Sequence, residues 1–284
     1  MRVLSLFDGC AGAYQALNNL GIECEYFASE VDKYAIQVAM KHFPDIIQLG
    51  DVASIPLLRI RDIDLLIGGS PCQDLSRAKH GKGLKGSKSS LFYHFAMAKD
   101  VLEPRYFLLE NVASMKNSER DNISEILGVE PILINSKHFT SQNRERYYWT
   151  NINVELPTWS GPTISEVIKQ SATALTEKRS EKAKAERRRV RAATGKDFSS
   201  FRDKITVKRV DQLANCVTTT KSPNMRIETK EGIRFLTPLE CERLQGMKNN
   251  YTVGVSNAQR YKMIGNGFTI PVIEHILKGM RTNG

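Results

Sequence analysis

The sequence has few cysteines, an excess of basic over acidic residues, and no long hydrophobic run. Its five cysteines are widely spaced and form no C-x-x-C pair, which argues against a disulfide framework and against a cysteine zinc site, so we expect no metal. No stretch approaches the roughly 20 consecutive apolar residues that cross a bilayer, and the N-terminus lacks the pattern of a signal peptide. We therefore expect a cytoplasmic protein that is neither secreted nor inserted in a membrane.

Positive charge is concentrated in one region of the 284 residues. The net charge is +10, and residues 166–209 hold fourteen Lys/Arg and six Asp/Glu, so this region alone contributes +8. The basic run at residues 181–191 has too few apolar residues to form a core. It is either a solvated insertion or an element that binds phosphates. The excess of positive charge favours a nucleic acid as the partner.

The first 154 residues alternate short apolar runs with amphipathic helical stretches. We expect strands near residues 3–7, 25–29, 46–49, 63–67, 106–109, 132–134 and 147–152. This alternation predicts an α/β fold with a doubly wound, mostly parallel, Rossmann-like sheet. Residues 155–232 are irregular and basic and predict a small second domain. The helical pattern returns at residue 233, so we expect residues 233–284 to rejoin the first domain.

The residues that follow the first three predicted strands suggest a cofactor, because ligands of open parallel sheets bind at the carboxyl ends of the strands. Gly9 and Gly12 follow the first strand, and glycine lets a backbone turn close to a ligand. Glu30 follows the second, where an acid typically bonds ribose hydroxyls. Asp51 follows the third and can accept from an adenine amino group. A strand-end carboxylate alone is more often a helix cap, but the three in order predict an adenosyl cofactor.

The next strand ends carry candidate catalytic groups. Cys72 follows Pro71 in the segment GGSPCQ, and its polar neighbours argue against the alternative, a buried inert cysteine. Glu110 follows the next strand. The segment QNRER at residues 142–146 places its first, third and fifth side chains on one side of an extended chain, unless it is a surface edge strand.

Two polar segments complete the pattern. The segment at residues 76–88 carries five basic residues, several glycines and no acid, so it is suited to contact phosphates. The segment at residues 216–226 is polar and offers side chains for reading a sequence. Its residues Thr218–Thr220 could equally form a plain strand.

These blocks, in this order, resemble those of the DNA (cytosine-5)-methyltransferase family. Within that family the chain is similar to the eukaryotic de novo type and to phage and bacterial relatives. Ala11 and the pair Gly267-Phe268 depart from the usual pattern, and both lie at the implied cofactor pocket. The matching segments are FDGCAG (7–12), Glu30, GD (50–51), GGSPCQ (68–73), ENV (110–112), QNRER (142–146), RFLTPLECERLQG (234–246) and GNGF (265–268).

The resemblance implies transfer of a methyl group from S-adenosylmethionine to C5 of a cytosine flipped out of double-stranded DNA. Cys72 would bond covalently to C6, and Glu110 would hold N3. Arg146 would bond O2, supported by Arg144. The implied cofactor contacts are Phe7, Asp8, Gly9, Cys10, Gly12, Glu30, Val31, Asp51, Val52, Pro71, Asn266 and Phe268. The implied DNA contacts are Gln73, Ser76, Arg77, Lys79, Lys82, Lys85, Gln142, Thr218, Thr219, Thr220 and Arg226.

Two alternatives use the same fold. One branch of the family methylates tRNA, but that branch usually carries a second proline before its Pro-Cys pair, and Ser70-Pro71 here favours DNA. The other alternative is an inactive relative that only binds DNA, against which the intact Cys72, Glu110 and Arg146 argue. The short recognition domain suggests a homo-oligomer on DNA, associated with the nucleoid of a bacterial or phage-infected cell. The biological role stays open between restriction-modification, protection of a phage genome and marking of host DNA.

Overall fold

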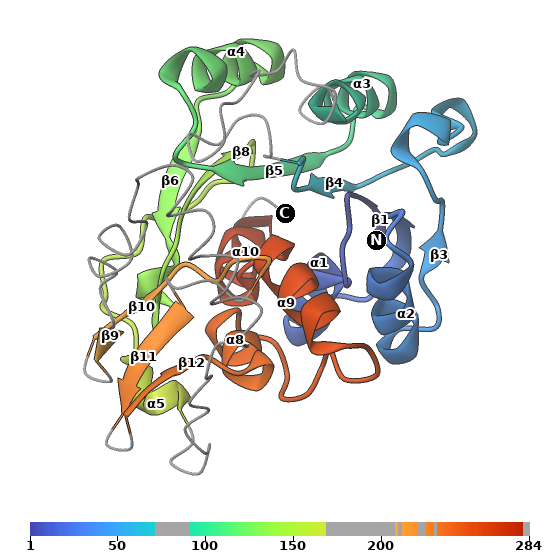
Figure 1. The fold of residues 1–284 in the computed structure, drawn as a ribbon. Coiled ribbons are helices and arrows are strands. Elements are labelled where there is room, and N and C mark those ends of the chain that lie inside the picture. The colour runs from blue at the N-terminus through green and yellow to red at the C-terminus, as the bar shows by residue number, and fades with distance from the viewer. Residues whose placement is uncertain (72–90, 169–207, 210–211, 221–224, 230–231, 281–284) are drawn as a thin grey trace, which may run out of the picture.

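A seven-stranded, mostly parallel sheet forms the centre of the protein (Figure 1). The computed structural model describes residues 1–71, 91–168, 208–209, 212–220, 225–229 and 232–280. The sheet order is β3-β2-β1-β4-β5-β8-β6, and only β8 runs antiparallel to its neighbours within this sheet. Its strands are β1 (Arg2–Leu6), β2 (Glu25–Ser29), β3 (Ile47–Gln48), β4 (Leu65–Gly68), β5 (Tyr106–Val112), β6 (Ile132–Asn135) and β8 (Glu145–Thr150).

Helices cover both faces of the sheet, as the expected doubly wound fold requires (Figure 1). One apolar core packs α1 (Gly12–Asn19), α2 (Lys33–His42) and α10 (Ile270–Lys278) against the sheet. The other packs α3 (Phe92–Leu102) and α4 (Asn117–Leu127) on the opposite face. Further helices are α8 (Pro238–Leu244) and α9 (Asn257–Asn266), and short 3-10 turns form η1 (Val52–Ser54), η2 (Leu57–Arg59) and η5 (Ser136–His138).

The burial pattern explains why these segments form strands. The strand β4 is buried along its whole length, and β1 and β2 are buried except at their first residues. Such continuous apolar strands are typical of a parallel sheet covered on both faces. All seven predicted strands are therefore confirmed, with ends shifted by a few residues. Because β1 to β5 run parallel, their carboxyl ends meet at one edge, which we call the rim.

The segment QNRER is not an edge strand. It spans β7 (Gln142–Asn143) and the start of β8, which lies between β5 and β6 in the interior of the sheet. The alternation of its side chains is confirmed: positions 142 and 144 are buried and positions 143 and 145 are exposed. The edge-strand alternative is wrong because β8 has a hydrogen-bonded neighbour on each side.

The region after residue 155 contributes small elements. The strand β10 (Ala214–Asn215) pairs with β7, and β9 (Lys208–Arg209), β11 (Arg226–Thr229) and β12 (Gly232–Phe235) form a three-stranded sheet. The helix α5 (Ile164–Val167) begins at Thr163 in a capping box with Glu166. The domain boundaries at residues 155 and 232 stay a prediction.

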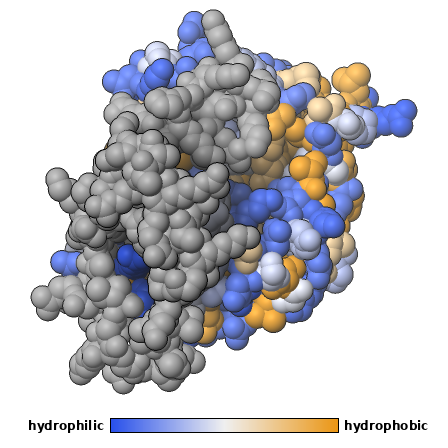
Figure 2. All heavy atoms as spheres, in the orientation of Figure 1, coloured by the Kyte–Doolittle hydropathy of each residue, from blue (hydrophilic) through white to orange (hydrophobic). Residues whose placement is uncertain are grey.

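The surface of the described residues mixes hydrophilic and hydrophobic side chains (Figure 2). The exposed large hydrophobic residues lie on several elements, and Tyr93 and Met97 share the outer side of α3. Among the described helices, none combines the length and the hydrophobicity that crossing a bilayer requires.

Candidate functional site

The loop after β1 turns sharply at the rim. Phe7, Gly9 and Ala11 all have φ near +60°, a left-handed conformation that costs a residue with a side chain free energy. A Cβ atom at Gly9 would meet nothing within 4 Å, so there is open space beside the loop. The backbone of this loop therefore turns around an open space that a ligand could occupy. This space agrees with the predicted position of the cofactor.

Glu30 braces this loop from the end of β2. One oxygen of its carboxylate accepts a hydrogen bond of 2.8 Å from the Gly9 amide. The other accepts from the amides of Val31 and Asp32, also at 2.8 Å. The Val31 side chain beside it is 70% exposed, which leaves an apolar face at the rim. Glu30 and Val31 thus place a carboxylate and an exposed apolar side chain next to the open space.

Asp8 is buried beneath the same loop. Its carboxylate accepts a hydrogen bond of 2.6 Å from the Tyr26 hydroxyl, and its other oxygen has no hydrogen-bond partner. Burial raises the pKa of Asp8 to about 6. Burial likewise raises the pKa of the neighbouring Cys10 to about 12, so that thiol stays protonated. Cys10 contributes its backbone carbonyl, which accepts from the Tyr251 hydroxyl.

The end of β3 supplies the third predicted cofactor carboxylate. Gly50 has φ of +74°, and the Ser29 hydroxyl donates to its carbonyl. Asp51 is exposed, and one of its oxygens accepts from the Ala53 amide at 3.0 Å. Asp51 therefore caps η1 with one oxygen and keeps the other for a ligand. The two interpretations of this carboxylate, a helix cap and a cofactor contact, are compatible. Val52 is buried below it.

Phe268 brings the C-terminal block GNGF to the rim. A Cβ atom at Gly12 would lie 3.6 Å from the Phe268 ring, and one at Gly69 would lie 3.2 Å from it. The ring therefore packs between the turns after β1 and β4, in ordinary contact with Gly12 and in a tighter contact at Gly69, where a side chain would crowd it. Asn266, two residues earlier, is exposed.

The turn after β4 leads directly to the predicted nucleophile. The Asn111 side chain donates to the Ser70 hydroxyl at 3.0 Å and to the Ser70 carbonyl at 3.3 Å, which fixes the backbone just before Pro71. Cys72 lies outside the described residues. So do six predicted DNA contacts: Gln73, Ser76, Arg77, Lys79, Lys82 and Lys85.

Glu110 and Arg146 form an ion pair at the end of β5. The Arg146 Nε atom lies 3.1 Å from Glu110 Oε1, and both side chains are largely buried, at 13% and 8% exposed. Burial alone would lower the pKa of the Arg146 guanidinium, but the Glu110 carboxylate and Cys216 raise it above its ordinary value. A Cβ atom at Gly69 would lie 3.2 Å from Glu110 Oε2, so the carboxylate faces the turn before Cys72.

Arg144 ties three segments together. Its guanidinium donates to the Gly267 carbonyl at 3.0 Å, to the Gly265 carbonyl at 3.4 Å, and to Cys216 Sγ at 3.2 Å. The Arg146 Nη2 atom lies 3.8 Å from the same sulfur. The sequence did not predict that Cys216 lies beside both arginines. Cys216 is 72 residues from Arg144, and no local pattern indicates a contact over that distance.

Gln142 lies inside the protein and does not face solvent. It is fully buried, donates to the Leu244 carbonyl at 2.9 Å and to Gln245 Oε1 at 3.0 Å, and accepts from the Val217 amide. Its amide is thus engaged in joining β7 to α8 and to the segment after β10. The expected DNA contact by Gln142 is therefore corrected to a structural role.

The segment after β10 carries the predicted sequence-reading residues. Thr218–Thr220 do not form a strand, and Thr219 and Thr220 are exposed. A Cβ atom at Gly265 would overlap the Thr218 backbone, so this segment packs directly on α9. Arg226 lies on β11, where its guanidinium stacks over the Phe235 ring at 5.1 Å.

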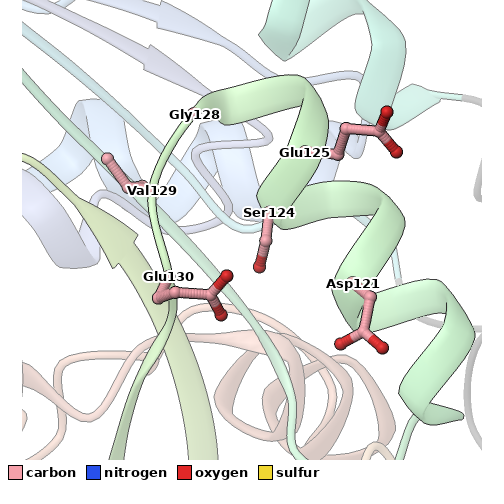
Figure 3. A pocket seen from close by; sticks show the side chains of 6 residues that line it. All are labelled: Asp121, Ser124, Glu125, Gly128, Val129 and Glu130. Atoms are coloured by element: carbon pink, nitrogen blue, oxygen red, sulfur yellow. The ribbon is translucent and has the colours of Figure 1, made fainter.

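A separate surface pocket of about 290 Å³ lies at the end of α4 (Figure 3). Three of its six lining residues are carboxylates, and none is a predicted site residue. Such a pocket repels phosphates, so it does not fit a nucleic acid. It is lined by Asp121, Ser124, Glu125, Gly128, Val129 and Glu130.

Similar proteins have been described in phages and bacteria. The chain is 36% identical over 169 residues to the orphan methyltransferase M.Rho11sI of Bacillus phage rho11s. The matched region covers 55% of this chain and 34% of that protein. The match to a second phage relative covers 38% of its length, so the chain spans little more than a third of these two proteins. It is 30% identical over 315 residues to the type II methyltransferase M.HpaII of Haemophilus parainfluenzae, covering 95% of this chain and 86% of that protein.

The fold is shared with solved structures. A DNMT2 mutant of Spodoptera frugiperda superposes with a TM-score of 0.74 at 17% identity, covering 99% of both chains. Residues 1–282 match the family described as C-5 cytosine-specific DNA methylase. The chain therefore belongs to the C-5 cytosine-specific DNA methylase family.

Proposed function

We propose that this protein is an S-adenosylmethionine-dependent methyltransferase that modifies C5 of cytosine in double-stranded DNA. The observation that carries the proposal is the buried pair of Glu110 and Arg146, 3.1 Å apart, facing the turn that leads into Cys72. A carboxyl group, a guanidinium and a thiol are the groups that addition to a pyrimidine ring requires. Membership of the family supports the same reaction.

The residues at the open space beside Gly9 fit the cofactor. The backbone cradle there would take the methionine part, Glu30 would bond the ribose, and the exposed Val31 would cover the adenine. Asp51 has an oxygen free to accept from the adenine amino group. When bound, S-adenosylmethionine supplies an electrophilic methyl group. Phe268, packed against Gly12 and Gly69, would separate the cofactor cradle from the core behind it.

The target base would lie between Cys72 and the ion pair. The Cys72 thiolate would bond C6, which makes C5 nucleophilic. Glu110 would hold the base through a proton shared between its carboxyl group and N3, and Arg146 would donate to O2 and balance charge that grows on the ring. Because C5 and C6 lie inside the base stack, the cytosine must leave the duplex. The final steps are loss of the C5 proton and release of the thiol.

Contact with DNA rests on charge and exposure. Residues 166–209 carry a net +8, and each lysine or arginine on a phosphate releases a counterion. Thr219 and Thr220 are exposed beside α9 and can donate and accept hydrogen bonds at base edges. Double-stranded DNA is therefore the partner that the charge of the sequence and the exposed threonines support best, and pairing of two copies on one DNA stays a prediction.

Trapping with DNA that contains 5-fluorocytosine tests the reaction. Fluorine at C5 cannot leave as a proton does, so in the presence of S-adenosylmethionine the protein should stay covalently bound to the oligonucleotide. The Cys72→Ser variant should bind the same DNA without forming the adduct. Absence of an adduct, although both ligands bind, would overturn the covalent mechanism. Bisulfite sequencing of DNA from expressing cells would then report the methylated atom and the sequence context, and RNA modified in place of DNA would favour the tRNA branch.

A further inference from the structure

Cys216 lies between the two arginines of the QNRER segment. Its sulfur is 3.2 Å from Arg144 Nη1 and 3.8 Å from Arg146 Nη2, and its nearest other polar contact is the Val217 carbonyl at 3.5 Å. The residue directly follows β10, the strand that pairs with β7. It therefore joins the segment predicted to read DNA to the arginine that would bind the base.

We propose that Cys216 is a positioning residue of the catalytic site, and that its thiolate holds the guanidinium of Arg146 in place for the target base. The inference rests on the proposed function, since it assigns a role within that reaction. Cys216 would not touch the substrate itself. It would act through Arg146, which within the described part of the chain also contacts Glu110 and the Glu145 carbonyl.

The charges of the buried cluster favour a thiolate. Among the described residues, the cluster around the sulfur holds two guanidinium groups, Arg144 and Arg146, and one carboxylate, Glu110, which pairs with Arg146. An uncompensated buried charge is costly, so a second negative group between the arginines lowers the free energy of the cluster. With a thiolate the order Glu110, Arg146, Cys216, Arg144 alternates in sign and sums to zero.

The environment of the sulfur agrees with this charge. Burial alone would raise the pKa of the Cys216 thiol, but the Arg144 and Arg146 guanidiniums hold it below its ordinary value. Among the described residues, the titratable side chains that act on the sulfur are Arg144, which precedes β8, and Arg146 on β8. Glu110 on β5 and Tyr148 on β8 act on Arg146 in turn. Burial raises the pKa of Tyr148, so its hydroxyl stays neutral. At the end of α9, the backbone carbonyls of Gly265 and of the C-cap Gly267 accept hydrogen bonds from Arg144.

The two arginines depend on the sulfur to different degrees. Arg144 keeps its hydrogen bonds to Gly265 and Gly267 when the sulfur is removed. Among the described residues, Arg146 would keep its contacts to Glu110 and to the neighbouring carbonyl of Glu145. Loss of the negative charge at position 216 is therefore expected to misplace Arg146 while the fold and the packing of α9 persist.

Serine at position 216 separates charge from hydrogen bonding, because it is close in size and still accepts hydrogen bonds. We expect Cys216→Ser to lower kcat for DNA methylation by about tenfold, as misplacement of a catalytic group does, with KM for DNA and the melting temperature nearly unchanged. A wild-type kcat in Cys216→Ser would overturn the proposal.

Thiolate absorbance in the ultraviolet tests the charge without using activity. The difference between wild type and Cys216→Ser should titrate with a midpoint below the ordinary value of about 8.5. Cys24→Ser is the matched control, since Cys24 is also half-buried but burial raises its pKa to about 11. A midpoint for Cys216 at or above the ordinary value would overturn the inference. If the wild type shows no methylation, the proposed function fails, and the titration still decides the state of Cys216.

Discussion

The Arg146 guanidinium reaches the Glu110 carboxylate because their strands run antiparallel. In the register of β5 with β8, Arg146 lies opposite Val112, and Val112 is two residues from Glu110. Residues two apart on a strand share a face, so Arg146 and Glu110 form a diagonal pair across the two strands. The direction of a single strand in an otherwise parallel sheet thus creates the central ion pair of the site.

Replacing Glu110 by glutamine keeps its size and removes its charge. We expect Glu110→Gln to lower the rate of methyl transfer by about 10²–10⁴-fold, the usual contribution of a positioned acid or base. Binding of S-adenosylmethionine, measured by calorimetry, should be unchanged because Glu110 lies apart from the cradle at Gly9. The control is Glu125→Gln on the exposed side of α4. A rate within a few-fold of wild type would remove Glu110 from the catalytic groups.

The Asn111 amide fixes the backbone before Pro71, so we expect Asn111→Ala to reduce kcat by about tenfold and stability by about 1–2 kcal/mol. Asn151→Ala is the matched control. The Asn151 side chain makes the same kind of link, to the Phe107 amide and the Arg105 carbonyl at 2.9 Å, but near the start of β5. It should cost stability and leave kcat unchanged, and equal loss of kcat in both variants would refute a specific role for Asn111.

Asp8 makes stability depend on pH. Burial raises the pKa of Asp8 in the folded protein to about 6, from about 4 in the unfolded chain. The stabilising contribution of this carboxyl group is therefore fully present below pH about 4. It is lost as the pH rises through about 6, because the buried group must then ionise. Asp8→Asn has no charge to bury. Its free energy of unfolding, relative to wild type, should therefore increase by about 1 kcal/mol between about pH 5 and about pH 7.5. Urea unfolding at the two pH values measures this, and a difference that is constant with pH would contradict it.

Gly246 is required by its surroundings as well as by its backbone. It has φ of +72°, and a Cβ atom there would overlap the Pro271 ring at the start of α10. Gly128 has φ of +73° but open space around it. We expect Gly128→Ala to cost about 1 kcal/mol from the backbone alone and Gly246→Ala about 3 kcal/mol or more. Equal costs in thermal unfolding would show that the overlap with Pro271 is relieved without strain.

The basic run at residues 181–191 lies outside the described residues, and its two interpretations predict different salt behaviour. Replacing its lysines and arginines by glutamine should weaken DNA binding and flatten the plot of log affinity against log salt if they contact phosphates. The same substitution should have no effect on that slope if the run is a solvated insertion. Fluorescence anisotropy at several salt concentrations distinguishes the two.

Much of the fold follows from local pattern. The strands at Glu25–Ser29 and Ile132–Asn135 agree with the predicted ranges within a residue, because apolar runs act locally. The rule that ligands meet at strand ends correctly places Gly9, Glu30 and Glu110 at one rim. The position of β8 between β5 and β6 could not be predicted, because strand order depends on pairing between distant segments.

The same limit explains the two errors of detail in the site. Gln142 looks like a surface residue in a polar segment, yet Leu244, Gln245 and Val217 enclose it from three distant parts of the chain. Cys216 looks like part of a polar strand, and only the tertiary fold brings it to Arg144 and Arg146. Contacts of this kind carry no periodic signal in the sequence.

The packing of Phe268 against Gly12 and Gly69 has a consequence for synthesis in the cell. The turn at Gly12 contacts the Phe268 ring only after some 250 further residues have left the ribosome. The helix α10, which packs on α1, is synthesised later still. A nascent chain stalled before residue 257 is therefore expected to hold an unfinished cradle, and separately expressed fragments divided near that point should regain activity only on mixing.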